Sequence, residues 1–342
     1  MTRRLNLLFG GITAAIVVAV AVIVTVNPFA SSPAPGTGSG PPSSAPSVST
    51  TVDPAQAPTP PKQGAYLGAW VGPDVFTQAN EISAVDSLQA EIGHKLSIVH
   101  TYLKWQASFP TPSDDAFLSQ GSTLLISWAG TDTKTIISGT ADSWIQTRAT
   151  QIKALGRPVF LEWRWEMDRP NLASQMHSGA DYVAAWDHIR AIFAAEGVHN
   201  AAWVWCPTAT GFADGRADAF YPGDSEVDWV CADAYPEFGT TASFASTVDP
   251  FLDWASHHDK PVMIGEFGVP ASYGAQQRAQ WLLAAQRVVT ADRQIKALLY
   301  FDANPAGQGP AGSYSLSGDA AALAAFRTIA RMPYFNPTGT SQ

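Results

Sequence analysis

Residues 158–170 read Pro-Val-Phe-Leu-Glu-Trp-Arg-Trp-Glu-Met-Asp-Arg-Pro, an apolar run that opens on Pro158 and breaks into a polar, aromatic loop at Glu166. Residues 261–270, Pro-Val-Met-Ile-Gly-Glu-Phe-Gly-Val-Pro, repeat the arrangement and end their apolar run at Glu266. Short apolar runs bounded by Pro and Gly are typical of buried strands. Each stretch therefore predicts a strand that has a glutamate at its carboxyl end.

Runs of this kind alternate with helical patterns from Gly64 to the end of the chain. The predicted strands are Tyr66–Val71, Leu96–Tyr102, Thr123–Trp128, Pro158–Trp163, Ala201–Trp205, Val227–Asp233, Pro261–Gly265 and Ala297–Phe301. Strands separated by helices predict a parallel sheet. Eight such units match an α/β fold of the (β/α)8 TIM-barrel type, which takes roughly 250 residues. A doubly wound sheet is the alternative.

Helical periodicity is clearest in four of the intervening segments. Apolar residues recur at helical spacing over 143–155, 181–195, 275–289 and 320–330. The segment between the fifth and sixth strands is short and rich in Gly and Asp, so it predicts a helix reduced to little more than a turn.

Composition narrows the class of partner. The chain has 342 residues, a net charge of −9, 46% apolar and 14% charged residues, and 12 Trp. Proteins that bind nucleic acid need basic patches, so this charge disfavours nucleic acid and polyphosphates alike. A neutral polymer such as a polysaccharide suits an acidic, Trp-rich surface, and a monomer is expected.

The first 63 residues predict export rather than fold. Arg3 and Arg4 precede an apolar stretch from Leu5 to Val26, so residues 1–30 read as an N-terminal signal anchor or as a cleaved signal peptide. Positive charge at the start keeps that end in the cytoplasm and directs the rest outward. Residues 31–63, mostly Ser, Thr, Pro, Gly and Ala, predict a disordered linker, and 64–342 the catalytic domain.

Two cysteines fall in the predicted domain, Cys206 and Cys231. An exported protein permits a disulfide between them. Both also lie at or near predicted strands, where small buried thiols are equally common. The sequence leaves both interpretations open.

The carboxyl ends of the strands form the active face of such a barrel. Two acids there, Glu166 and Glu266, are the candidate catalytic residues. The candidate substrate-binding residues are Trp70, His100, Trp105, Trp128, Trp165, Trp205, Tyr235 and Phe301. A zinc site needs three protein ligands, and no such set is apparent, so neither a metal nor another cofactor is expected. His100 is interpreted as a hydrogen-bonding residue of the wall.

A pair of carboxylates from separate strand ends is what hydrolysis of a glycosidic bond requires. The alternative for any one glutamate is an ion pair or a helix cap. Glu162, Arg164 and Glu166 alternate along the fourth strand, so all three are expected to point to the barrel interior or its mouth. Arg164 is expected to pair with Glu162 as a structural support and to leave Glu166 free at the rim.

These motifs resemble glycoside hydrolase family 26. The resemblance rests on Trp165-Glu166-Met-Asp and on the run that ends in Gly-Glu266-Phe-Gly, with supporting similarity at 98–105, 125–128, 203–207 and 227–235 and in the pair Arg278 and Trp281. It implies a (β/α)8 retaining glycosidase that cleaves β-1,4-mannan. It also implies that Glu166 is the acid/base, that Glu266 is the nucleophile and that Tyr235 is a hydrogen-bond partner of the nucleophile.

Departures from the family pattern leave the identity of the substrate sugar open. Trp165 stands where the family has His, Glu162 where it has Arg, Asp168 where it has Asn, and Phe301 or Asp302 where it often has Trp. The same machinery acting on a β-glucan or β-xylan is therefore the first alternative. A non-catalytic carbohydrate-binding barrel at the cell surface is the second.

Overall fold

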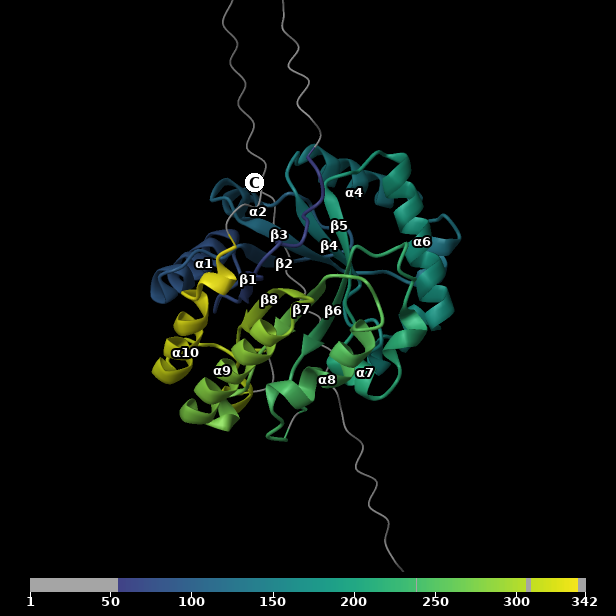
Figure 1. Cartoon of the computed structure of the whole chain (residues 1–342). Helices are drawn as coiled ribbons and strands as arrows, with labels where there is room; N and C mark the ends of the chain where they lie inside the picture. Colours follow the sequence, from purple (N-terminus) through teal and green to yellow (C-terminus); the bar gives the residue numbers. More distant parts are fainter. Residues whose placement is uncertain (1–54, 238, 306–308, 338–342) are drawn as a thin grey trace, which may run out of the picture. The chain divides into compact units, whose positions relative to one another are not determined.

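The computed structural model describes residues 55–237, 239–305 and 309–337. Within them, eight parallel strands close into a barrel in chain order, and helices surround it (Figure 1). The first and last strands close the ring, with Tyr66 opposite Ala297 and Val71 opposite Asp302. The prediction of a (β/α)8 barrel is confirmed.

The strands lie close to their predicted positions. They are β1 Tyr66–Val71, β2 Ile98–Leu103, β3 Thr123–Trp128, β4 Val159–Trp163, β5 Ala201–Trp205, β6 Trp229–Ala234, β7 Val262–Phe267 and β8 Ile295–Asp302. Three of them have the predicted bounds, and the others differ by one or two residues at an end. Such agreement follows from the near-continuous apolar character of strands that are buried on both faces.

The helices form the outer layer. They are α1 Gln78–Ile92, α2 Pro112–Ser119, α3 Thr133–Ile137, α4 Asp142–Ala154, α5 Ala173–Met176, α6 Gly179–Ala195, α7 Ala209–Ala213, α8 Phe244–Ala255, α9 Ala275–Ala291 and α10 Ala320–Ala330. Short 3-10 helices span Pro170–Leu172, Ala217–Phe220, Ala271–Tyr273, Pro310–Gly312 and Pro333–Phe335. The short α7 between β5 and β6 agrees with the reduced helix that the sequence predicts.

Two apolar layers fill the fold. The inner layer lies inside the barrel and includes Leu125, Phe160, Val204, Cys231 and Met263. The outer layer packs the strands against the helices. Because successive strand residues face opposite sides, each position belongs to one layer or the other. This alternation decides which of the predicted aromatic residues can reach the active face.

Part of the predicted linker lies against the barrel. Residues 55–63 belong to the same compact unit as the barrel. Ala57 packs on the inner layer, and the Tyr66 hydroxyl donates a 2.9 Å hydrogen bond to the Thr59 carbonyl. The second contact places Thr59 beside Tyr66, the first residue of β1. The predicted anchor, 1–30, and the linker up to residue 54 lie outside the described residues. Within the described part, no helix combines the length and the apolarity that a bilayer crossing requires.

Candidate active site

The loop after β4 positions Glu166 through two left-handed residues. Arg164 has φ 55° and Glu166 has φ 53°, which are uncommon values for residues other than glycine. Backbone hydrogen bonds hold both: Arg164 donates to the Trp128 carbonyl at 3.0 Å, and Glu166 donates to the Cys206 carbonyl at 2.7 Å. Strained backbone of this kind persists where the surrounding structure enforces it. Here two backbone hydrogen bonds fix the turn that carries the Glu166 side chain.

The same turn overturns one prediction. Arg164 does not pair with Glu162, because the strand alternation ends at Trp163. The Arg164 guanidinium instead donates to the side chain of Gln175 at 2.5 Å. Glu162 remains inside the barrel and accepts a hydrogen bond from Ser127, whose hydroxyl also lies 2.6 Å from Nε2 of His100.

Glu166 is buried and carries a raised pKa. Burial is the largest cause, the negative charges of Glu266 and Asp168 add to it, and Arg169 opposes it; together they raise the pKa of Glu166 to about 8. The expectation that Glu166 is free at the rim is also wrong, because the Arg169 guanidinium lies 2.8 Å from its buried carboxylate. Because the charge of Glu266 raises the pKa of Glu166 and Arg169 lowers the pKa of both, the two acids lie within electrostatic reach of each other. At neutral pH, Glu166 holds a proton that it can donate.

Glu266 lies at the end of β7, where a register shift between Ile264 and Phe267 interrupts the pairing with β8. The Tyr235 hydroxyl donates to its Oε2 at 2.7 Å, and the Tyr102 hydroxyl donates to its Oε1. Burial raises the pKa of Glu266, while the two hydroxyl groups and Arg169 lower it. Hydrogen bonds to the charged form favour ionisation, so both tyrosines support a carboxylate here.

Two further acids lie beneath the site. Glu162 and Asp233 are buried, and burial raises the pKa of both well above the usual range, with the charge of Glu266 adding to the effect. Burial also lowers the pKa of His100 to about 3, so its imidazole is neutral. His100 is 1% exposed and contacts Ser127, so it supports the interior network rather than lining the open face.

The predicted aromatic residues fall into two groups, one beside Glu266 and one in the outer layer. Trp70 meets Tyr102 edge-on at 4.9 Å, and Tyr102 meets Trp165 at 5.2 Å. On the other side, Tyr235 lies edge-on to Phe301 at 5.9 Å. These rings pack against the two tyrosine rings whose hydroxyls hold Glu266, so the structure brings Trp70, Trp165, Tyr235 and Phe301 together with it.

Trp128 and Trp205 do not join this group. Both are 0% exposed and belong to the outer layer, because Ser127 and Cys206 take the inward positions beside them. The indole of Trp205 donates to the Phe220 carbonyl at 2.9 Å. Trp105 stacks flat on Trp128, with ring centroids 4.3 Å apart. The structure thus gives Trp128 and Trp205 a packing role.

Three residues of the site escaped the sequence analysis. Tyr102 bonds the predicted nucleophile, Arg169 pairs with the predicted acid/base, and Tyr314 packs 5.0 Å from Tyr235. Tyr102 could have been found from the sequence, because it lies two residues after His100 in β2 and so faces the same, inner side of the strand. Arg169 and Tyr314 lie in loops, where no periodicity indicates direction.

Asp168 ties the β4 loop to the loop after β5. Its carboxylate accepts from the Thr208 amide at 2.9 Å and from the Thr208 hydroxyl at 2.6 Å. A Cβ at Gly211 would lie 2.0 Å from Oδ2 of Asp168, so only glycine fits there. Asp168 therefore positions the loop that carries Glu166.

Cys206 and Cys231 form a disulfide inside the barrel. Their sulfur atoms lie with a carboxylate oxygen of Glu162 in the one group of His, Cys, Asp and Glu side chains among the described residues that is close enough to hold a metal. A thiol must be free and deprotonated to bind zinc. The disulfide therefore takes both sulfurs out of that role.

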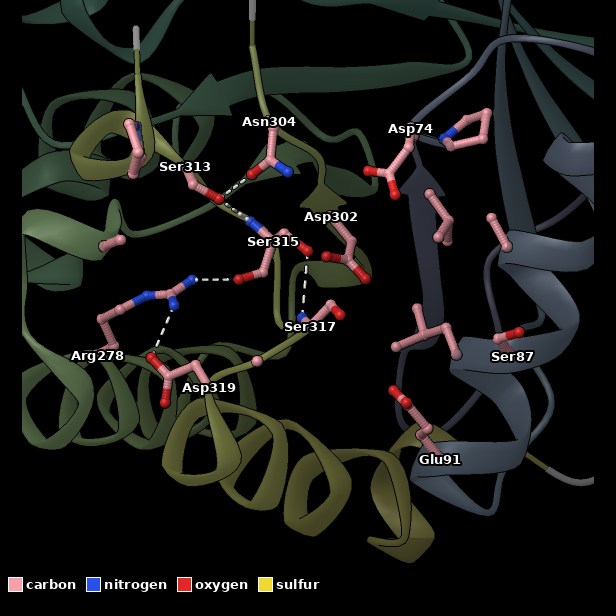
Figure 2. A pocket seen from close by; sticks show the side chains of 18 of the residues that line it. Asp74, Ser87, Glu91, Arg278, Asp302, Asn304, Ser313, Ser315, Ser317 and Asp319 are labelled. Atoms are coloured by element: carbon pink, nitrogen blue, oxygen red, sulfur yellow. Dashed lines mark hydrogen bonds and ion pairs between the residues drawn. The ribbon is translucent and has the colours of Figure 1, made fainter.

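A separate cavity of about 1230 Å³ lies between α1, the ends of β1 and β8, and the segment before α10 (Figure 2). Arg278 borders it, donates to the Tyr314 and Ser315 carbonyls at 3.0 Å, and pairs with Asp319 at 2.7 Å. Asp302 accepts from the Leu316 amide at 2.8 Å. Neither Glu166 nor Glu266 lines this cavity, whose charged side chains tie the β8–α10 segment together.

Similarity to known proteins agrees with this geometry. No protein-family model matches the chain. The structure is similar to a GH26 β-mannanase from Bacteroides ovatus, with TM-score 0.64, 15% identity, and 82% of this chain and 92% of the other covered. It is also similar to a GH26 endo-β-1,4-mannanase catalytic domain from Bacillus sp. JAMB-750, with TM-score 0.61, 14% identity and coverage of 80% and 88%. The fold is that of glycoside hydrolase family 26.

The sequence is also similar to an endoglucanase and to a β-1,3-xylanase. It is 31% identical over 294 residues to an endoglucanase H from Acetivibrio thermocellus, which covers 80% of this chain and 31% of the other. It is 28% identical over 141 residues to a β-1,3-xylanase from a Vibrio species, covering 40% of this chain and 28% of the other. The chain thus spans about a third of the length of the curated relatives it matches. At the level of the fold, the structural similarity bears out the resemblance to family 26 that the motifs predict.

Proposed function

We propose that this protein is a glycoside hydrolase that cleaves internal bonds of a β-linked polysaccharide and retains the anomeric configuration. One observation carries the proposal. Glu266 is held through both carboxylate oxygens by Tyr102 and Tyr235, while Glu166, which pairs with Arg169 and feels the charge of Glu266, has a pKa of about 8. One acid is thus prepared to attack and the other to donate a proton.

The proposed reaction has two steps. In the first, a carboxylate oxygen of Glu266 bonds to the anomeric carbon, the glycosidic C–O bond breaks, and the proton of Glu166 passes to the leaving oxygen. In the second, Glu166 takes a proton from water, the water oxygen bonds to the anomeric carbon, and the bond to Glu266 breaks. Glu166 is then protonated and Glu266 ionised, as at the start.

The favoured substrate is a β-glucan. Support comes from the similarity to endoglucanase H, which extends over 80% of this chain. The second candidate is β-1,4-mannan, which the motifs around Glu166 and Glu266 imply. The solved mannanases are only 14–15% identical to this chain, a level that supports the fold and not the sugar. A β-xylan is the third candidate, from the similarity to a β-1,3-xylanase.

A screen of the full chain tests this proposal. Defined oligosaccharides of β-glucan, β-mannan and β-xylan are offered in equal amounts, and the lengths of the products are resolved. Release of internal fragments from one series supports an endo-acting glycosidase and names its sugar. Binding without cleavage of any series would support the carbohydrate-binding barrel instead.

We also propose that the domain acts outside the cytoplasmic membrane, either released or held by the N-terminal segment. The basic and apolar start of the chain supports this, as does the disulfide between Cys206 and Cys231, since such bonds persist in oxidising compartments. Action as a monomer stays a prediction.

A further inference from the structure

The loop between β1 and α1 exposes an aromatic ring that is connected to the candidate active site by ring contacts. Phe76 is 61% exposed and its neighbour Val75 is 65% exposed; Ile137, at 38%, is the other large apolar residue that stands out among the described residues. Leaving an aromatic ring in water forgoes the burial that usually stabilises it. Val75 and Phe76 together form a contiguous exposed apolar patch on this loop, and such patches can mark ligand-binding sites.

Phe76 is connected to the nucleophile by ring contacts. Its ring stacks on Trp70, with centroids 6.1 Å apart and an interplanar angle of 28°. Trp70 in turn meets the edge of Tyr102 at 4.9 Å, and the Tyr102 hydroxyl donates to Glu266. The exposed ring thus lies two ring contacts from the side chain that holds Glu266.

The loop holds Phe76 in place. The side-chain amide of Asn80 donates to the Val75 carbonyl at 2.9 Å, and Thr77 caps α1 by accepting from the Asn80 amide at 3.1 Å. At the other end of the loop, Gly72 donates to the Asp302 carbonyl at 2.9 Å. A ring fixed by its backbone loses little conformational freedom when a ligand stacks on it.

The position of Phe76 in the strand order indicates on which side of the scissile bond it would contact a glycan. The acid/base candidate follows β4, so the leaving-group part of a glycan extends over that side of the barrel. In the closed ring of strands, β8 lies opposite β4, and β1 is the neighbour of β8. Sugars on the non-reducing side of the scissile bond therefore extend toward β1 and its loop.

We propose that Phe76, supported by Trp70, is a stacking platform for a glycosyl residue on the non-reducing side of the cleaved bond. The ligand is a β-linked pyranose whose ring face is apolar. This inference rests on the proposed function for the direction in which the glycan lies across the site. It deepens that function by adding a subsite beyond the reacting sugar.

The test compares Phe76→Ala with Ile137→Ala in the full chain. Ile137 is the matched control, because it is another exposed apolar residue and lies on α3. Initial rates are measured on oligosaccharides of increasing length from the cleaved series and on an aryl glycoside of one sugar. Phe76→Ala should raise KM for the long substrates at least about tenfold and leave the aryl glycoside unchanged. Phe76→Trp should restore the long substrates, and Ile137→Ala should change neither.

Retardation of the full chain in gels containing each polysaccharide separates the platform from catalysis. If Phe76→Ala hydrolyses long substrates as the unchanged chain does, the platform is refuted while the proposed function stands. If the unchanged chain hydrolyses nothing but its retardation depends on Phe76, stacking of a glycan on Phe76 stands, while the proposed function and the position of Phe76 relative to a cleaved bond both fail. An equal loss on the aryl glycoside would also overturn the platform, because that substrate does not reach it.

Discussion

The Tyr235 hydroxyl donates a 2.7 Å hydrogen bond to Oε2 of Glu266. The hydroxyl of Tyr102 donates to the other oxygen of the same carboxylate. A carboxylate held at both oxygens cannot rotate away from its working position, and each hydrogen bond favours its charged form. The pair of tyrosines thus orients the nucleophile that we propose.

Removing either hydroxyl should slow the reaction without unfolding the protein. A hydrogen bond to a charged group contributes about 1.5–3 kcal/mol, so Tyr235→Phe and Tyr102→Phe should each lower kcat by about 10- to 100-fold. Tyr273→Phe is the control, since its hydroxyl bonds the Ala242 carbonyl away from the two glutamates. Full activity in Tyr235→Phe would refute this role.

The pH dependence should follow Glu166. Because its pKa is about 8 and its protonated form donates the proton, kcat/KM should fall as pH rises above about 8. Arg169 lowers the pKa of both glutamates. Arg169→Met should therefore move both limbs of the pH profile to higher pH. Arg190→Met, whose guanidinium lies over Trp203, should leave the profile in place. A shift to lower pH in Arg169→Met would contradict this account.

The disulfide should stabilise the domain. Cys206 and Cys231 are 25 residues apart in the chain, and closing a loop of this size contributes about 2–4 kcal/mol. Replacing both with Ala should lower the free energy of unfolding by about that amount in urea titrations. The native chain should lose similar stability when the bridge is reduced. An unchanged midpoint in both experiments would argue against a formed bridge.

Trp205 should prove to be a packing residue. It is 0% exposed among outer-layer aromatics, so Trp205→Ala should lower the free energy of unfolding by about 3–5 kcal/mol. At a temperature where the variant is still folded, KM for the glycan should stay unchanged. A large rise in KM with unaltered stability would return Trp205 to the substrate-binding group.

The barrel could be predicted because its signal is local. Each strand is a largely apolar run, several have a Pro or Gly at a boundary, and β1, β3 and β5 have the predicted bounds. The positions of Glu166 and Glu266 at strand ends follow from the same pattern. The alternation of strand residues could also have excluded Trp128 and Trp205 from the substrate-binding group. Each directly follows an inward-facing residue, Ser127 or Val204, and must therefore face outward.

The loops could not be predicted in the same way. Arg164 turns away from Glu162 because two non-glycine residues adopt left-handed backbone, and nothing in their side chains indicates it. That conformation depends on hydrogen bonds to the Trp128 and Cys206 carbonyls from neighbouring strands. Tertiary contacts of this kind have no local signature, so the partner of Arg169 also appears only in the folded chain.

The central claim assigns separate roles to Glu166 and Glu266, and azide rescue of Glu166→Ala and Glu266→Ala tests it most directly. With an activated leaving group that needs no proton, Glu166→Ala should still form the glycosyl-enzyme, and azide should restore turnover with unchanged anomeric configuration. Glu266→Ala should be inactive without azide and give the inverted product with it. Inversion with Glu166→Ala and retention with Glu266→Ala would exchange the two roles. If neither variant lost at least about a hundredfold in hydrolysis of the natural glycan, the site itself would be contradicted.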